Sequence, residues 1–154
     1  MRSIRALKAD EWDDAMALVW KVFLRFEADV YSTEGIENFR KFITDETLYK
    51  MFLQGEYIMF GCFDDDGKII GVISARNKNH ISLLFVEESC HRQGVASALM
   101  RCLCDHLLTE LRQTYITVHS SPYAVGFYHK YGFVDTDKVQ MNSGIIYTPM
   151  KFFL

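Results

Sequence analysis

The stretch Ile81–Leu111, ISLLFVEESCHRQGVASALMRCLCDHLLTEL, decides the fold of this chain. Its first six residues are nearly continuous in apolar side chains, which predicts a strand buried on both faces. A polar loop over residues 87–93 follows, and Gly94 then opens a helix. Apolar residues recur in that helix at positions 95, 98, 99, 102, 103, 107 and 111. This spacing draws one wide apolar stripe, so the helix is expected to cover a sheet.

The start of this helix is the first candidate for a binding site. The first turn of a helix presents free backbone N–H groups and the positive end of the dipole, an arrangement that suits phosphate. Small residues at Gly94 and Ala96 let a ligand approach the backbone closely. On Gly94 alone, an ordinary strand-to-helix turn is the better interpretation, because short glycine motifs are weak signals.

Two blocks of sequence resemble one family. His91-Arg92-Gln93-Gly94-Val95-Ala96 is similar to the (Gln/Arg)-x-x-Gly-x-(Gly/Ala) signature of GNAT-type N-acetyltransferases, with His91 standing where Gln or Arg is usual. The segment 121–133 resembles that family's Asn-x-x-Ala-x-x-x-Tyr-x-x-x-Gly-Phe block. Ala124, Tyr128, Gly132 and Phe133 match it, and Ser121 replaces the Asn. The resemblance covers residues 54–154 well and the first two helices only by layout.

The resemblance implies acetyl-coenzyme A as co-substrate. Main-chain amides of the loop and helix start would hold its pyrophosphate, and the 84–86 strand would pair with its pantetheine arm like an added strand. The same three residues are also expected to be plain core strand, since backbone and side chain do different jobs. The implied cofactor-binding residues are Leu84, Phe85, Val86, His91, Arg92, Gln93, Gly94, Val95, Ala96, Ser97 and Ser121.

Bulk properties exclude several classes of protein. The chain has 154 residues, 49% apolar and 24% charged, which predicts one globular domain over residues 1–154. A net charge of −3 without a Lys/Arg cluster argues against nucleic-acid binding. No apolar run is long enough to span a bilayer and no signal segment follows Met1, so we expect a cytoplasmic protein without a membrane partner. The four cysteines lack zinc spacing and the 64–66 aspartates lack the glutamate of a calcium loop, so we expect no metal.

The remaining periodicities predict the other elements. We expect a strand at 3–6, a helix from Asp10 to about Ala28, and a second helix capped by Ser32 or Thr33. Strands follow at 57–63, 69–76 and 115–118, a short helix at 123–131, and a final hairpin from 133–134 and 145–153. This order predicts an α/β layered sheet, which matches the GNAT fold that the resemblance implies: a mixed sheet of about six to seven strands flanked by about four helices.

Acetyl transfer to an amine needs a proton acceptor for the amine and a proton donor for the leaving thiolate. Tyr128 matches the family's tyrosine and is the predicted general acid; the alternative is a packing aromatic among its neighbours. The base is left open between His80, which could instead be a solvated strand-end residue, and His119, which could instead hydrogen-bond the acceptor.

The resemblance places the acceptor pocket at the first two helices and their connector. The candidate substrate-binding residues there are Phe26, Glu27, Asp29 and Tyr31, with Glu34 nearby. Aromatic and acidic groups together would suit a cationic amine, such as a polyamine or an amino sugar. A solvated acidic connector is an equally good interpretation, and a protein lysine or N-terminus stays open as acceptor.

The leading hypothesis is therefore an N-acetyltransferase that moves the acetyl group of acetyl-coenzyme A to a primary amine of a small molecule or peptide. The alternative is a non-catalytic acyl-coenzyme A-binding module that regulates a partner, because such a module needs no acid or base. The apolar end, residues 145–154, could pair with a second copy in a homodimer or could complete the core of the monomer.

Overall fold

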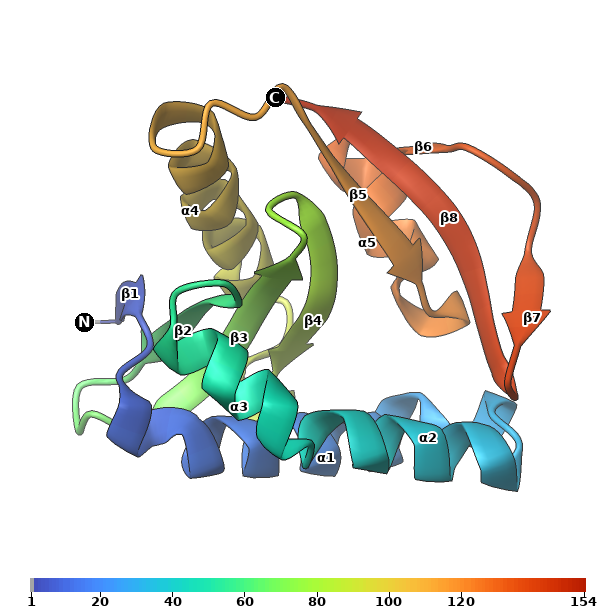
Figure 1. The fold of residues 1–154 in the computed structure, drawn as a ribbon, viewed down its shortest axis with the longest axis horizontal. Coiled ribbons are helices and arrows are strands. Elements are labelled where there is room, and N and C mark those ends of the chain that lie inside the picture. Colours follow the sequence, from blue (N-terminus) through green and yellow to red (C-terminus); the bar gives the residue numbers. More distant parts are fainter. Residues whose placement is uncertain (1) are drawn as a thin grey trace.

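The computed structural model describes residues 2–154. Eight strands form one mixed sheet in the order β1-β2-β3-β4-β5-β8-β6, with β7 paired to β8 (Figure 1). The strands are β1 (Ser3–Ala6), β2 (Ile58–Phe63), β3 (Ile69–Arg76), β4 (His80–Val86), β5 (Tyr115–Ser120), β6 (Val134–Asp135), β7 (Gln140–Asn142) and β8 (Ile145–Phe153). The helices are α1 (Trp12–Phe26), α2 (Thr33–Ile43), α3 (Glu46–Leu53), α4 (Val95–Thr109) and α5 (Val125–Tyr131). The predicted mixed α/β class is confirmed.

Helices cover both faces of the sheet. On one face α1, α2 and α3 pack on β2–β4 through a core that includes Val19, Phe23, Val72 and Leu83. On the other face α4 and α5 pack through Leu99, Leu103, Ile116 and other buried residues. Residues at positions 95, 99, 103 and 107 of the predicted stripe of α4 are buried, whereas Cys102 is only partly buried and Met100 and Cys104 take core positions. The buried strip of α4 is therefore rotated slightly from the predicted one.

Two elements were absent from the sequence-based prediction. Helix α3 begins at its cap Asp45, whose side chain accepts a hydrogen bond from the Thr47 amide at 2.8 Å. Its aromatic residues Tyr49 and Phe52 pack on Trp12, with ring centroids 5.3 and 5.0 Å apart. Strand β7 is only three residues long, and its pairing comes from β8. The sheet thus has one strand more than the upper end of the prediction.

The sheet opens between β4 and β5. These two parallel strands pair only at His80 with Thr117 and at Ile81 with Val118. Beyond that point they diverge, and Figure 1 shows β5 and β8 leaning away from β4. A bulge at Ser82 accompanies the split, because Ser74 on β3 faces Leu83 while Ala75 faces Ile81.

Strand β8 pairs with β5 on one side and with β6 and β7 on the other. The apolar segment 145–153 therefore hydrogen-bonds within its own sheet. A homodimer through this segment stays a prediction. None of the helices within residues 2–154 has the length and hydropathy of a membrane span.

Candidate active site

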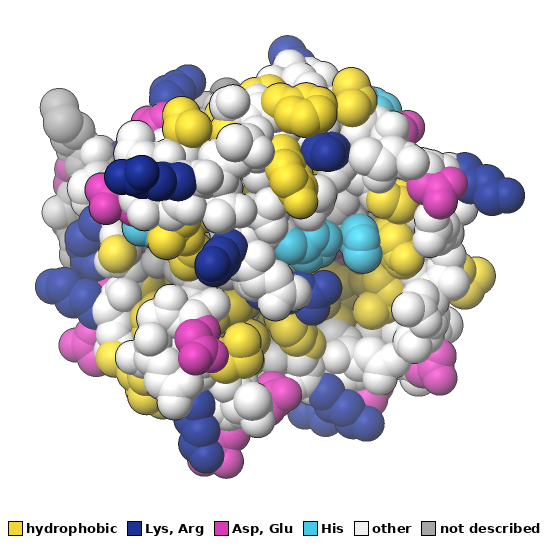
Figure 2. Space-filling view, turned by 45° about the horizontal axis from the view of Figure 1, so that its top comes forward, with side chains coloured by type: hydrophobic (Ala, Val, Ile, Leu, Met, Phe, Trp, Pro, Cys, Tyr) yellow, Lys and Arg dark blue, Asp and Glu magenta, His cyan; other side chains and the backbone are white. Residues whose placement is uncertain are grey.

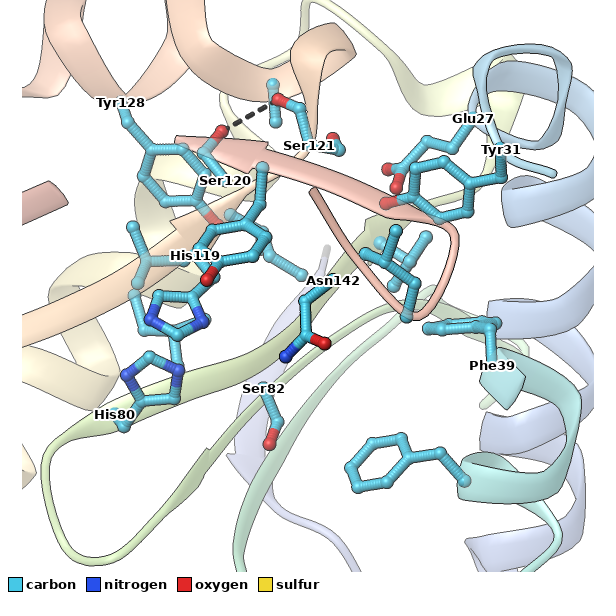
Figure 3. A pocket seen from close by; sticks show the side chains of 18 of the residues that line it. Glu27, Tyr31, Phe39, His80, Ser82, His119, Ser120, Ser121, Tyr128 and Asn142 are labelled. Carbon is cyan, nitrogen blue, oxygen red and sulfur yellow. Dashed lines mark hydrogen bonds between the residues drawn. The ribbon is translucent and has the colours of Figure 1, made fainter. Parts of the chain in front are cut away.

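A cleft of about 400 Å³ lies where β4 and β5 diverge. Strand β4 and the ends of β3 and β5 form one part of its wall, and the connector between α1 and α2, helices α2 and α5, and the β7–β8 hairpin form the rest (Figure 3). Figure 2 shows histidine and Lys/Arg side chains at the rim of a hollow with an apolar lining. Among the predicted site residues, the lining includes Glu27, Tyr31, His80, Leu84, Phe85, His119, Ser121 and Tyr128.

The start of α4 has the geometry expected of an anion site. Gly94 is the N-cap with φ of 79°, a left-handed conformation that glycine adopts without strain. A Cβ there would meet no atom within 4 Å, so the backbone conformation, and not crowding, favours glycine. No described side chain caps α4, which leaves the amides of its first turn available to a ligand. Val95 faces the core, whereas Ala96 and Ser97 are partly exposed at this end.

His91, at the position that departs from the family signature, braces the loop. Its Nε2 lies 2.7 Å from the main-chain oxygen of Val86, and its ring lies 4.9 Å from that of Phe26. Arg92 is exposed with φ of 61°. The Gln93 side chain donates to the Ser89 carbonyl at 3.2 Å and accepts a hydrogen bond from Arg2. The side chains of 91 and 93 thus hold the loop, and its main chain stays free for a ligand.

Tyr128 projects from α5 into the cleft. Its side chain is 3% exposed and packs against the rings of Phe127 and Phe133. Burial, reinforced by the nearby Glu27 carboxylate, raises the pKa of Tyr128. The phenol therefore stays protonated at neutral pH, as a proton donor must. Ser121 is buried beside it, and its carbonyl accepts a hydrogen bond from Ser120 Oγ at 2.9 Å.

The two candidate histidines lie together on one wall of the cleft. His80 Nδ1 is 2.8 Å from Thr117 Oγ1, and its ring is 4.7 Å from that of His119, which stacks on Tyr147 at 4.4 Å. Burial lowers the pKa of His80 to about 4, with further contributions from His119 and Arg76. Burial and Arg76 also lower the pKa of His119. Both rings are neutral at pH 7, and His80 is a weak base.

The predicted acceptor residues divide into two pairs. Glu27 and Tyr31 line the cleft, and Figure 3 shows them together on the side away from His80. Burial raises the pKa of Glu27 to about 7, an effect that a hydrogen bond from Ser121 partly offsets. Burial and the Glu27 carboxylate raise the pKa of Tyr31. Phe26 and Asp29 do not line the cleft: Phe26 packs on His91 and Tyr123, and Asp29 is exposed.

Sequence reasoning missed six polar residues of the cleft, namely Asn38, Arg76, Ser82, Ser120, Asn142 and Tyr147. Arg76 ends a predicted strand and Ser82 is the one polar residue in the 81–86 run, which was a usable signal. Asn142 and Tyr147 reach the cleft only because the final hairpin folds across the sheet. Among residues 2–154, no group of three or more His, Cys, Asp or Glu side chains is arranged to hold a metal ion.

Comparisons with solved structures match this fold. A solved GCN5-related N-acetyltransferase from Rhodopseudomonas palustris superposes with a TM-score of 0.82 at 22% identity, over 100% of this chain and 96% of that one. The PaiA N-acetyltransferase from Thermoplasma acidophilum, solved in complex with coenzyme A, also has a TM-score of 0.82, at 18% identity over 100% and 99% of the chains. The spermidine/spermine N-acetyltransferase SpeG from Vibrio cholerae follows at 0.67, at 19% identity over 99% and 95%.

Sequence comparisons give one relative and one family model. The UPF0157 protein YqkA of Bacillus subtilis (strain 168) is 25% identical over 123 residues, which is 78% of this chain. The match covers 34% of that protein, so the chain spans about a third of its length. The family model "Acetyltransferase (GNAT) domain" matches residues 27–154. The chain therefore belongs to the GNAT family of acetyltransferase enzymes, as its two sequence blocks predicted.

Proposed function

We propose that this chain is an N-acetyltransferase that moves the acetyl group of acetyl-coenzyme A to the primary amine of a small molecule. The observation that carries the proposal is one cleft that joins a split in the sheet to a protonated, buried tyrosine, beside an uncapped helix start. Family membership supports it, as do the coenzyme A complex of PaiA and the polyamine acetylation named for SpeG.

The coenzyme would bind along the open side of β4. Its pyrophosphate would accept hydrogen bonds from the amides of residues 92–97, where the dipole of α4 favours negative charge. Its pantetheine arm would pair with the main chain of Leu84, Phe85 and Val86, whose cleft side β5 leaves unpaired. A main-chain N–H of this segment would then polarise the thioester carbonyl.

Tyr128 would act as the general acid. When the amine attacks the thioester carbon, the carbon–sulfur bond breaks and the thiolate leaves with an electron pair. The Tyr128 hydroxyl would donate its proton to that sulfur. Its raised pKa keeps the proton in place until the thiolate forms, and burial makes an unprotonated thiolate costly.

Glu27 is the best-matched general base in the cleft. A primary amine has a pKa near ~10.4 and must lose a proton before it can attack. A pKa of about 7 lets Glu27 accept that proton near neutral pH. His80, with a pKa of about 4, would accept it less readily. His80 and His119, predicted as bases from the sequence, are instead proposed to form the wall of the acceptor site.

Calorimetric titration with acetyl-coenzyme A, followed by thiol release with a panel of amines, tests the proposal. Tight binding with amine-dependent thiol release, and a mass increase of one acetyl group on the amine, is the expected result. Tight binding without release from any amine would instead favour a non-catalytic acyl-coenzyme A-binding module. No binding would contradict the assignment of the coenzyme loop.

A further inference from the structure

The cleft holds both of the buried side-chain polar atoms that residues 2–154 leave without a hydrogen bond. They are Arg76 Nε and Ser82 Oγ, and both residues line the cleft. Buried polar groups in proteins are nearly always paired, because an unpaired group loses its hydration without compensation. Two such atoms on one wall therefore indicate that a bound molecule supplies the missing acceptor.

Arg76 brings an unbalanced positive charge to this wall. It ends β3 opposite His80, and none of the ion pairs among the described residues includes it. Its neighbours in the cleft, His80 and His119, are neutral at pH 7. Glu27 is the one carboxyl group in the described lining, and Figure 3 shows it on the opposite side of the cleft from His80 and Ser82.

The backbone directs polar groups toward the same place. Ser82 is the extra residue of the β4 bulge, and a bulge re-aims the side chain that it carries. Tyr57, the polar neighbour behind Ser82 and Arg76, bonds to Ser74 Oγ at 2.6 Å. Burial raises the pKa of Tyr57, and the nearby Ser82 hydroxyl partly offsets that rise but makes no hydrogen bond of good geometry to it. Asn142, at the end of β7, projects into the cleft above Ser82 in Figure 3. A guanidinium, a hydroxyl and an amide thus face one small volume.

We infer that the acceptor amine carries a carboxylate, and that Arg76 and Ser82 bind this carboxylate while Glu27 and Tyr128 face the amine. This inference rests on the proposed acetyl transfer. A carboxylate accepts two parallel hydrogen bonds from a guanidinium, and its single charge matches the single arginine. A polyamine would instead place a second ammonium group against Arg76, so the cleft disfavours the polycation that the acidic connector suggested.

The strand geometry sets the size of such a molecule. Ser82 and Leu84 are two residues apart on β4, about 7 Å along an extended strand. Leu84 lies in the segment proposed to flank the thioester, so amine and carboxylate would sit within one small amino acid. The acceptor class is therefore an amino acid. The number of carbon atoms between its amino group and its carboxylate is the variable to be measured.

The test compares matched acceptors on the wild-type protein and on Arg76→Gln. Each set contains an amino acid, the primary amide of that amino acid, and the amine that remains when its carboxylate is removed. The sets differ in the position of the amino group, from α to ω. In the wild type, kcat/KM for the best amino acid should exceed that of its two partners by about 10-fold or more. Arg76→Gln should lower kcat/KM for the amino acid by roughly 10- to 100-fold, mainly through KM, and leave the decarboxylated amine nearly unchanged.

Controls separate binding from folding. Arg101→Gln removes an exposed arginine on the outer face of α4 and should leave kcat and KM unchanged for every acceptor. Arg76→Lys keeps the positive charge but loses the paired N–H donors of the guanidinium, so it should recover only part of kcat/KM for the amino acid. Affinity for acetyl-coenzyme A and the melting temperature verify that each variant is folded. Carboxylates that lack an amino group should inhibit the wild type in competition with the amino acid, and should inhibit Arg76→Gln only weakly.

Two results would overturn the inference while the proposed function stands: equal turnover of amino acids and decarboxylated amines by the wild type, or an equal loss for both in folded Arg76→Gln. If no amine is acetylated although acetyl-coenzyme A binds, the proposed function fails by itself. The inference is then decided by calorimetric titration of an amino acid into the coenzyme-loaded wild type and into coenzyme-loaded Arg76→Gln. Weaker binding of the amino acid to the variant supports the inference. Equal binding to both proteins, or no binding to either, overturns it.

Discussion

At the scale of single residues, the chemistry depends on two groups whose pKa values burial moves upward. Tyr128 is held protonated, and the Glu27 carboxyl titrates near neutrality. The first is suited to donate a proton and the second to accept one. Active sites typically shift the pKa values of neighbouring groups so that one donates a proton and another accepts one.

Replacing Tyr128 by Phe should lower kcat by roughly 10²- to 10³-fold, the usual contribution of a general acid. The ring packing against Phe127 and Phe133 is retained, so affinity for acetyl-coenzyme A should hold. Steady-state thiol release and calorimetry measure the two quantities. Tyr131→Phe removes a hydroxyl from the same helix outside the cleft and should turn over like the wild type. Comparable losses in both variants would mean that Tyr128 is only a packing residue.

Glu27→Gln should remove a titration from the pH profile of activity. In the wild type, kcat/KM is expected to rise with pH through about 7 as the Glu27 carboxyl loses its proton. The variant should be slower and should keep only the gradual rise that comes from the acceptor amine itself. A profile of kcat/KM from pH 5.5 to 9 tests this. An unchanged break near 7 in Glu27→Gln would assign the proton acceptor to another group.

The same carboxyl should make stability pH-dependent. Its folded pKa of about 7 lies above the ordinary 4.5, so its contribution is full below 4.5 and is lost as pH rises through 7. Relative to wild type, Glu27→Gln should therefore gain roughly 1–3 kcal/mol between pH 4.5 and 8. The lowered pKa of His80 acts in the opposite sense, losing stability as pH falls below about 6.5, but is common to both proteins. Urea unfolding at several pH values measures the difference.

At the scale of elements, the β7–β8 hairpin packs against α2, where Gly35 and Gly144 let the two backbones approach closely. The Ser32 amide donates to the Gly144 carbonyl at 3.3 Å, and the Asn38 side chain donates to the Ser143 carbonyl at 3.1 Å. A Cβ on Gly35 would lie 2.2 Å from the Gly144 oxygen. This contact holds Asn142, Ile145 and Tyr147 over the cleft, which supports a small acceptor rather than a protein.

Gly35→Ala should therefore displace the hairpin. Overpacking against backbone should cost about 1–3 kcal/mol, and a melting temperature lower by roughly 2–10 °C is expected. KM for the acceptor should rise more than the dissociation constant for acetyl-coenzyme A, whose loop lies elsewhere. Gly126→Ala is the matched control, because it is also helical and its added Cβ meets nothing within 4 Å. Equal melting temperatures and acceptor KM values for Gly35→Ala and wild type would contradict the role of this contact.

At the scale of the whole molecule, the coenzyme is expected to join two halves of the sheet. Strands β4 and β5 share two residue pairs, whereas β3 and β4 pair along most of their length. Figure 1 shows the resulting opening between β4 and the β5–β8 layer. A ligand seated there would replace the missing strand contacts and bind the folded state alone.

Acetyl-coenzyme A at about 100 times its dissociation constant should add about 2.7 kcal/mol of stability. For a chain of this size, that corresponds to a melting temperature higher by about 5–10 °C. ADP at the same concentration, which carries a pyrophosphate without the pantetheine arm, should bind more weakly and give a smaller shift. Differential scanning fluorimetry measures both. Equal shifts for the two ligands would show that the arm does not bridge the sheet.

The sequence by itself determined the elements whose signals are local. The run 81–86, the helix from Gly94 and the block ending at Gly132-Phe133 carried the fold class and the family, because periodicity, glycine conformation and motif spacing act over a few residues. Helix α3 and strand β7 were missed. The first is stabilised by Trp12 from another helix and the second by pairing with β8, and both effects arise from distant parts of the chain.

Only the tertiary structure decided which polar residues share the cleft. The split after Ile81 and Val118 is a relation between two strands, so no local pattern contains it. It brings Arg76, Ser82 and Asn142 together from three strands and leaves Phe26 and Asp29 outside. The pKa of Glu27 likewise depends on its burial and on a hydrogen bond from Ser121, which is far away in sequence. Sequence patterns fix local conformation, whereas a site's charge balance depends on which distant groups are packed together and which are kept from water.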